Sequence, residues 1–205
     1  MRSESIVLAV AGICFGVILG WVIGAQQANQ RPAPLSAAAS PVPAGEGAGS
    51  ARQAPPLDEG RVQSLMTVIK NDPKNAAAVV QLANTYFDGE RYADAIKWYD
   101  ESLRLDPANP DASTDLGISY YYAGQTDRAL QQFEQSLKLD PRHTKTMLNQ
   151  GIVLAFGKQD LAGAEAAWKR VVASAPDSPE GKAASRALEG IKAAGHARGA
   201  PTPGS

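Results

Sequence analysis

The sequence is poor in the residues that build most active sites. Among its 205 residues there are one cysteine and two histidines. Because Cys14 lies in an apolar N-terminal run, the remainder can form no disulfide, redox pair or cysteine-based metal site. No nucleophile or metal ligand accompanies His143 or His196 in the sequence. A net charge of −1 excludes a strong basic field. We therefore expect no enzyme, no cofactor, no metal and no nucleic-acid partner.

Proline is present in a regular pattern. Pro73, Pro107, Pro141 and Pro176 divide the middle of the chain into segments of 34, 34 and 35 residues. A fixed period of this size predicts stacked repeats, because each unit alone is too small to bury its apolar face.

Six positions recur in register within these segments. They hold Leu82, Ala83, Tyr86, Ala95, Tyr99 and Pro107, then Leu116, Gly117, Tyr120, Ala129, Phe133 and Pro141, then Gln150, Gly151, Leu154, Ala164, Trp168 and Pro176. The pattern resembles the tetratricopeptide repeat, whose signature is Leu-Gly, Tyr, Ala, an aromatic residue and a closing Pro. The third segment departs most from the signature and has one extra residue, which we place in the turn near Asp160.

The resemblance implies an all-α fold, an α-solenoid of about three helical hairpins with flanking helices. We expect Gly89, Gly124 and Gly157 to supply the left-handed or tightly turned residue within each hairpin. The predicted elements are a capping helix at 57–73, repeats at 75–108, 109–142 and 143–177, and a C-terminal capping helix at 178–194. Residues 195–205 are predicted to be a disordered tail.

The first helix of each repeat is predicted to start at a polar capping residue. Asn75 and Asn109 occupy the N-cap slot in the first two repeats, and Pro110 follows at the first helical position. His143 occupies the same slot in the third repeat. Because Asn caps better than His, the sequence predicts that His143→Asn stabilises the third repeat.

Residues 1–25 are predicted to form a transmembrane anchor. Residues 6–25 are twenty residues without a charge, enough to cross about 30 Å of hydrocarbon. The main alternative is a signal peptide cleaved after Ala25, but the apolar run is long for one and places Ile23 three residues before the cut. The short N-terminal flank favours a single-pass protein of a bacterial inner membrane, with its repeats in the periplasm. Residues 26–56 are predicted to be a disordered Ala/Pro/Gly-rich linker.

A stripe of small residues runs along the predicted anchor, formed by Gly12, Gly16, Gly20 and Gly24. Glycines four residues apart let two helices approach closely in lipid, which predicts a homodimer or pairing with another membrane subunit. Glycine is also common in membrane helices in general, so both interpretations stay open.

The resemblance also implies a binding surface, because the first helices of such repeats line a concave groove that holds a peptide or a helix. The positions carried over to this groove are Val80, Asn84, Phe87, Asp111, Thr114, Ile118, Tyr121, Tyr122, Lys145, Leu148, Ile152 and Phe156. Only Asn84 and Lys145 match the clamp that grips a chaperone's C-terminal carboxylate, so that ligand is disfavoured. For each position, the alternative is a place in the packed core.

Together these features predict a membrane-tethered, non-catalytic scaffold that binds a protein or peptide partner. An alternative comes from residues 164–184, AEAAWKRVVASAPDSPEGKAA. They resemble the end of membrane-anchored repeat proteins of bacterial cytochrome c maturation, which implies a factor that holds apocytochrome chains.

The predicted topology can be tested with a reporter enzyme that is active only outside the cytoplasm. Fused after Ser205, it should be active in bacterial cells, because the repeats are expected beyond the membrane. Mass spectrometry of the mature protein should find the anchor retained. A mature chain that begins at Gln26 would contradict the anchor and support the signal peptide.

Overall fold

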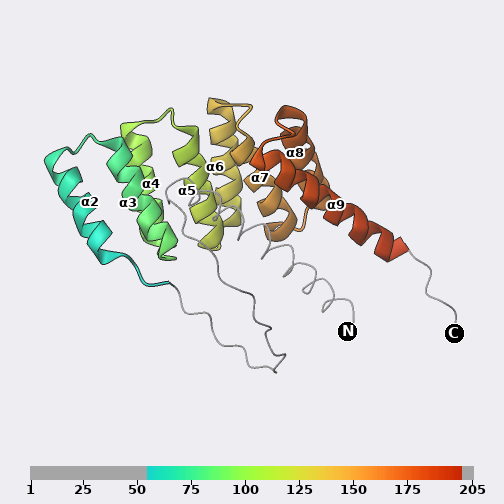
Figure 1. The fold of residues 1–205 in the computed structure, drawn as a ribbon, viewed down its shortest axis with the longest axis horizontal. Helices are drawn as coiled ribbons and strands as arrows, with labels where there is room; N and C mark the ends of the chain where they lie inside the picture. Colours follow the sequence, from blue (N-terminus) through green and yellow to red (C-terminus); the bar gives the residue numbers. More distant parts are fainter. Residues whose placement is uncertain (1–54, 200–205) are drawn as a thin grey trace, which may run out of the picture. The chain divides into compact units, whose positions relative to one another are not determined.

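The computed structural model describes residues 55–199 and contains, in this range, eight α-helices and one π-helical turn (Figure 1). They are α2 (Glu59–Asn71), α3 (Ala76–Asp88), α4 (Tyr92–Leu105), α5 (Pro110–Tyr122), α6 (Thr126–Leu139), α7 (Thr144–Ile152), η2 (Val153–Gly157), α8 (Leu161–Ser174) and α9 (Pro179–Gly199). The predicted anchor with its glycine stripe, and the predicted linker up to residue 54, lie outside the described residues.

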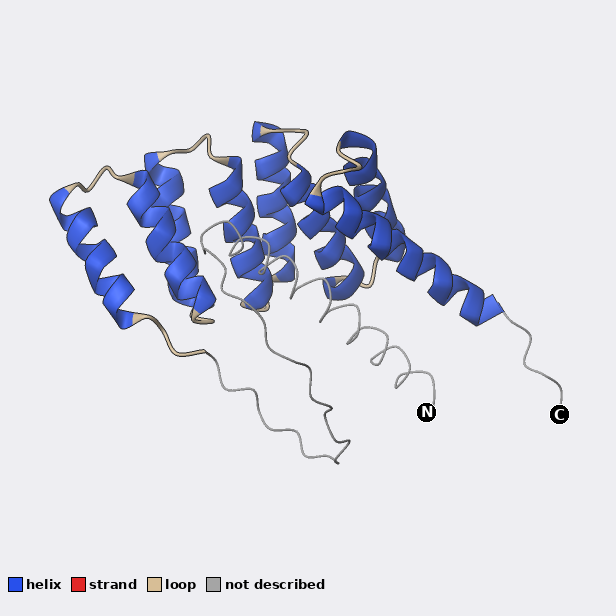
Figure 2. Ribbon diagram, viewed as in Figure 1, coloured by secondary structure: helices blue, strands red, loops and turns tan. Residues whose placement is uncertain are grey.

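The helices pack as successive hairpins. α3 pairs with α4, α5 with α6, and α7 with α8, while α2 covers α3 and α9 covers α8 and α7. α4 also contacts α5, which joins the first repeat to the second. Figure 2 shows only helices and connecting loops across the described residues. The all-α solenoid predicted from the 34-residue period is thereby confirmed.

Each hairpin is held by a small residue of its first helix facing an aromatic residue of its second. A Cβ atom at Gly117 would lie 2.5 Å from Cε1 of Phe133, and one at Gly151 would overlap the indole ring of Trp168. Ala83 takes the same position in the first repeat, where it shares a buried cluster with Tyr99. The recurring sequence positions are therefore the contacts between the paired helices.

The turns within the hairpins agree with the prediction only in part. Among the described residues, those with positive φ are Glu90 (55°), Gly124 (76°) and Gln159 (57°), so of the three glycines only Gly124 is left-handed, while Gly89 lies in the turn after α3. Gly89 has a φ of −83°, and its Cβ would lie 3.0 Å from a methyl group of Leu57. Gly89 therefore lies in close contact with the chain before α2, which favours a small residue there.

The extra residue of the third repeat lies within its first helix, and not in the turn near Asp160. The amide of Lys158 donates to the carbonyl of Val153, five residues back, at 3.1 Å. A π-helical turn of this kind accommodates one additional residue without breaking the helix. Asp160 instead caps α8, accepting a hydrogen bond from the amide of Gly163 at 2.8 Å.

The end of α9 also corrects the sequence-based boundary. The helix continues to Gly199, five residues into the predicted disordered tail. Residues 195–199, GHARG, include an alanine and an arginine, which favour helix, and the first proline beyond them is Pro201.

The two strained turns can be compared by a matched pair of substitutions. Gln159→Gly should stabilise the chain by about 0.5–1 kcal/mol, because glycine adopts positive φ without a steric penalty. Gly124→Ala should destabilise it by about 1 kcal/mol, since the space around that position is open and only backbone strain changes. Urea unfolding followed by circular dichroism measures both. A loss of stability in Gln159→Gly would contradict the backbone argument.

Candidate functional site

The positions predicted for the groove lie on α3, α5, α7 and η2, and we call the accessible ones the first-helix face. Asp111 is exposed, and eight positions are partly exposed: Val80, Asn84, Phe87, Ile118, Tyr121, Tyr122, Lys145 and Phe156. Three others are buried, with exposed fractions of 0% for Thr114, 2% for Leu148 and 5% for Ile152.

These three buried side chains correct the predicted groove. Helices α5, α6, α8 and α9 all contact α7, so a residue of α7 is covered on most of its sides. The carbonyl of Leu148 accepts a hydrogen bond from the indole of Trp168 at 3.1 Å. Thr114, Leu148 and Ile152 therefore belong to the packed interior and offer no side-chain surface to a partner.

An aromatic cluster occupies the end of the first-helix face where α3 and α5 terminate. Phe87 and Tyr122 meet edge to face, with ring centroids 5.6 Å apart, and Tyr121 contacts Tyr122 at 5.7 Å. Tyr92, from the first turn of α4, stacks on Tyr122 at 5.1 Å and meets Phe87 at 5.4 Å. Sequence reasoning missed Tyr92, since it lies on a second helix and reaches the cluster only through the packing of the first repeat on α5.

The cluster is half-buried and neutral. Burial raises the pKa of both Tyr121 and Tyr122 above the ordinary value, so their hydroxyl groups keep their protons at physiological pH. Phe87 and Tyr121 also pack against the hydrophobic core of the first two repeats. The rings are therefore held rigidly by the fold while part of their surface remains accessible.

Asn84 is oriented by a residue of the neighbouring helix. The hydroxyl of Tyr99, on α4, donates a hydrogen bond to Oδ1 of Asn84 at 2.5 Å. This bond holds the amide in place, and its Nδ2 group can donate to an acceptor. A peptide carbonyl is such an acceptor.

Lys145 is committed to ion pairs between the second and third repeats. Its Nζ lies 2.8 Å from Oδ1 of Asp115 and 3.6 Å from Oδ1 of Asp111. Burial lowers the pKa of Lys145, but the two carboxylates outweigh this and raise it overall. Burial raises the pKa of Asp115, and Lys145 opposes that rise. Lys145 is thus charged and already paired, which makes it a poor receptor for a partner's carboxylate.

His143 lies in a hydrogen-bonded network that the sequence did not indicate. Its Nδ1 is 2.6 Å from Oγ1 of Thr146, and its Nε2 is 3.4 Å from Oδ1 of Asp111. This contact with His143, and secondarily Lys145, lowers the pKa of Asp111 to about 2 despite partial burial. The contact of His143 with a hydroxyl group, that of Thr146, was not foreseen from the sequence.

A carboxylate that contacts an imidazole, which in turn contacts a hydroxyl group, is the arrangement found in many nucleophilic active sites. Here the hydroxyl of Thr146 is completely buried. It also lies 2.6 Å from the hydroxyl of Thr114 and 2.8 Å from that of Ser136. No substrate can reach it, so the network is a buried polar contact that joins the second repeat to the third.

His143 is the N-cap residue of α7, as predicted, but the same network changes what an asparagine would do there. Asn75 and Asn109 cap their helices as predicted, accepting from the amides of Ala78 at 3.0 Å and Ala112 at 2.9 Å. The side chain of His143 makes no such bond to the backbone of α7, because it faces Thr146 and Asp111 instead. An asparagine at position 143 would gain a cap and lose these contacts, so the expected stabilisation no longer follows.

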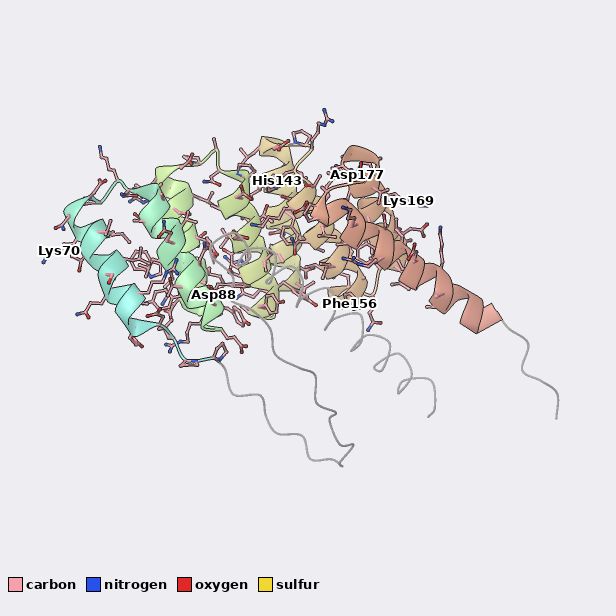
Figure 3. The ribbon with its side chains drawn as sticks, viewed as in Figure 1. Lys70, Asp88, His143, Phe156, Lys169 and Asp177 are labelled. Carbon is pink, nitrogen blue, oxygen red and sulfur yellow. The ribbon has the colours of Figure 1, made fainter. Side chains whose placement is uncertain are left out.

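The polar network and the aromatic cluster occupy opposite ends of the helices. Figure 3 shows His143 at one end, and Asp88 and Phe156 at the other. Across residues 55–199 no group of three metal-ligating side chains is found. None of the helices in that range is both long enough and apolar enough to cross a membrane.

Two family models match the chain. One, described as TPR repeat, covers residues 83–124, and the other, described as tetratricopeptide repeat, covers residues 114–188. No curated protein matches the sequence.

Solved structures of other repeat proteins are similar to this chain. A crystal structure of MamA protein is 20% identical, with a TM-score of 0.56 over 68% of this chain and 76% of that one. The Sgt2 TPR domain from Aspergillus fumigatus is 23% identical, with a TM-score of 0.54 over 63% and 85%.

A third structure, the first TPR of Spaghetti (RPAP3) bound to the HSP90 peptide SRMEEVD, is 26% identical. Its TM-score is 0.53, over 61% of this chain and 96% of that one. The two model matches cover the same hairpins whose small residues and aromatic rings interlock. This chain therefore belongs to the tetratricopeptide-repeat family, whose domains are non-catalytic modules for protein–protein interaction.

Proposed function

We propose that this protein is a membrane-tethered scaffold that binds a peptide or a helix of a partner protein on its first-helix face. The observation that carries the proposal is the accessible aromatic cluster of Phe87, Tyr92, Tyr121 and Tyr122. Rigid aromatic side chains held in place by their own fold are typical anchors of protein interfaces.

Two further features support binding on this surface. Asn84, a partly exposed residue of the face held in place by Tyr99, carries an amide donor that can satisfy a carbonyl of a bound peptide. The RPAP3 repeat domain, similar in fold, is described with a bound peptide. A repeat domain with a preformed anchor cluster and a side-chain amide donor held in place is suited to the same kind of ligand.

The membrane tether is proposed from the sequence. The uncharged residues 6–25 supply an anchor, and residues 26–56 supply a linker that lets the repeats reach partners at a distance from a bacterial inner membrane. The stripe of Gly12, Gly16, Gly20 and Gly24 is proposed as a contact with a second copy of the anchor or with another membrane subunit.

Site-specific photo-crosslinking in the producing cells tests the binding face without knowledge of the partner. A photoreactive phenylalanine analogue in place of Tyr122 should give a discrete crosslinked product. The same analogue in place of Leu139, which is 45% exposed at the end of α6, is the matched control and should give none. Recovery of c-type apocytochromes from position 122 would support the cytochrome-maturation alternative.

A second substitution measures the contribution of the face. Ile118→Gln should lower the yield from position 122 about five-fold or more, because removing a central apolar contact costs about 1 kcal/mol or more. Leu139→Gln should leave the yield unchanged. Crosslinks from position 139 alone would move the binding site to the second helices and overturn the proposal.

A further inference from the structure

The charges of the repeats are divided unequally between first and second helices. The first helices, α3, α5 and α7 with η2, carry the carboxylates Asp88, Asp111 and Asp115 and the single ammonium of Lys145. The second helices, α4, α6 and α8, carry six acidic and six basic residues. The first helices of the three repeats thus carry a net charge of −2, from three carboxylates and one ammonium, whereas the second helices carry a net charge of zero.

Lys145 does not neutralise this charge. It is shared by Asp115 and Asp111, so one ammonium serves two carboxylates. Asp88 is exposed, and in residues 55–199 no basic group lies within ion-pair distance of it. The first-helix face therefore keeps carboxylate charge that the described part of the chain does not pair.

Asp88 and Asp115 are close enough to influence each other. Partial burial raises the pKa of Asp88, the nearby Arg61 of α2 opposes this, and the charge of Asp115 adds to the rise. The hydroxyl of Tyr99, which orients Asn84, also has its pKa raised, by burial first and then by Asp115 and Asp88. A cation bound at the exposed Asp88 would also be attracted by Asp115.

The aromatic cluster adjoins this negative region. Phe87 immediately precedes Asp88 in the chain. The negative charge of Glu90 contributes to the raised pKa of the Tyr122 hydroxyl. Aromatic faces attract cations, and guanidinium and ammonium groups approach them readily. The chain uses this contact elsewhere, because the guanidinium of Arg128 lies 4.0 Å from the ring centre of Tyr120.

We propose that the first-helix face binds a basic amphipathic segment of a partner protein, one in which lysines or arginines alternate with apolar side chains. The apolar side chains would contact the aromatic cluster and Ile118. The basic ones would pair with Asp88 and be attracted by the negative charge that Lys145 leaves uncompensated on Asp111 and Asp115. This inference rests on the proposed function, since it specifies the ligand of the same surface.

An acidic ligand is the opposite case. The peptide in the RPAP3 structure, SRMEEVD, ends in Glu-Glu-Val-Asp. On this chain such a peptide would meet three carboxylates, and the one ammonium on these helices is already paired. Like charges brought together at an interface oppose binding, so the electrostatics of this face select against acidic tails.

Two fluorescein-labelled peptides test the sign of the ligand charge. The basic peptide is Lys-Leu-Ala-Lys-Leu-Phe-Lys-Lys-Ala-Phe-Lys-Leu, and the acidic one has Glu at every Lys. Binding to the full chain in a neutral detergent is measured by fluorescence anisotropy. The basic peptide should bind at least ten-fold more tightly at low salt, and its affinity should fall as salt is raised.

Substitutions of single charges locate the effect. Asp88→Asn should weaken binding of the basic peptide about three-fold, and Asp88→Lys about ten-fold. Glu134→Gln, which removes one charge from the second helix α6, should change it less than two-fold and is the matched control. Because Asp88 is exposed, we expect each variant to keep the circular dichroism melt of the parent chain.

The outcomes separate this inference from the proposed function. Equal or tighter binding of the acidic peptide, equal effects of Asp88→Asn and Glu134→Gln, or no binding of either peptide would overturn the inference. A crosslink from position 122 to a partner would leave the proposed function standing in each case. If that crosslinked segment carries net negative charge, the proposed function holds and the basic ligand is excluded.

Discussion

The structure depends on one steric relation, the contact of a small residue on each first helix with an aromatic ring on the second. At Gly117 and Gly151 there is no room for a Cβ beside Phe133 and Trp168, and Ala83 lies with Tyr99 in the same buried cluster. A larger residue at these positions would separate the paired helices, and the surface that the hairpins present would change with them. The proposed binding face therefore depends on residues buried behind it.

The third repeat shows how this relation tolerates an irregularity. Its first helix contains one residue more than the others, yet Gly151 still faces Trp168. The π-helical turn at Val153–Gly157 takes up the additional residue after the interlocking position, so the hairpin still closes. The third repeat also contacts the second through polar groups, the buried hydroxyl groups of Thr114, Ser136 and Thr146.

The hydrogen-bonded network around His143 and the first-helix face both include Asp111 of α5, but they differ in how many of their groups are free to bind a partner. The network binds its hydroxyl groups, His143 and Lys145 to other residues of the chain, which leaves little for a ligand. The aromatic cluster at the opposite end keeps part of its surface accessible, with Asp88 beside it. At one end the polar groups are paired with each other, and at the other end Asp88 makes no ion pair with a described residue. This difference favours binding of a partner near Tyr122.

The sequence by itself determined the repeat period, the helical hairpins, their interlocking residues and the caps at Asn75 and Asn109, because each depends on spacing within about 34 residues of chain. It also indicated which helices would carry the face that we propose for binding. Only the tertiary structure decided which side chains on that face are accessible. Thr114, Leu148 and Ile152 are buried because neighbouring helices cover them, and Tyr92 joins the face because α4 packs on α5. The pairing of Lys145 with Asp115, and of His143 with Thr146, likewise needed the distances between repeats, which no single repeat contains.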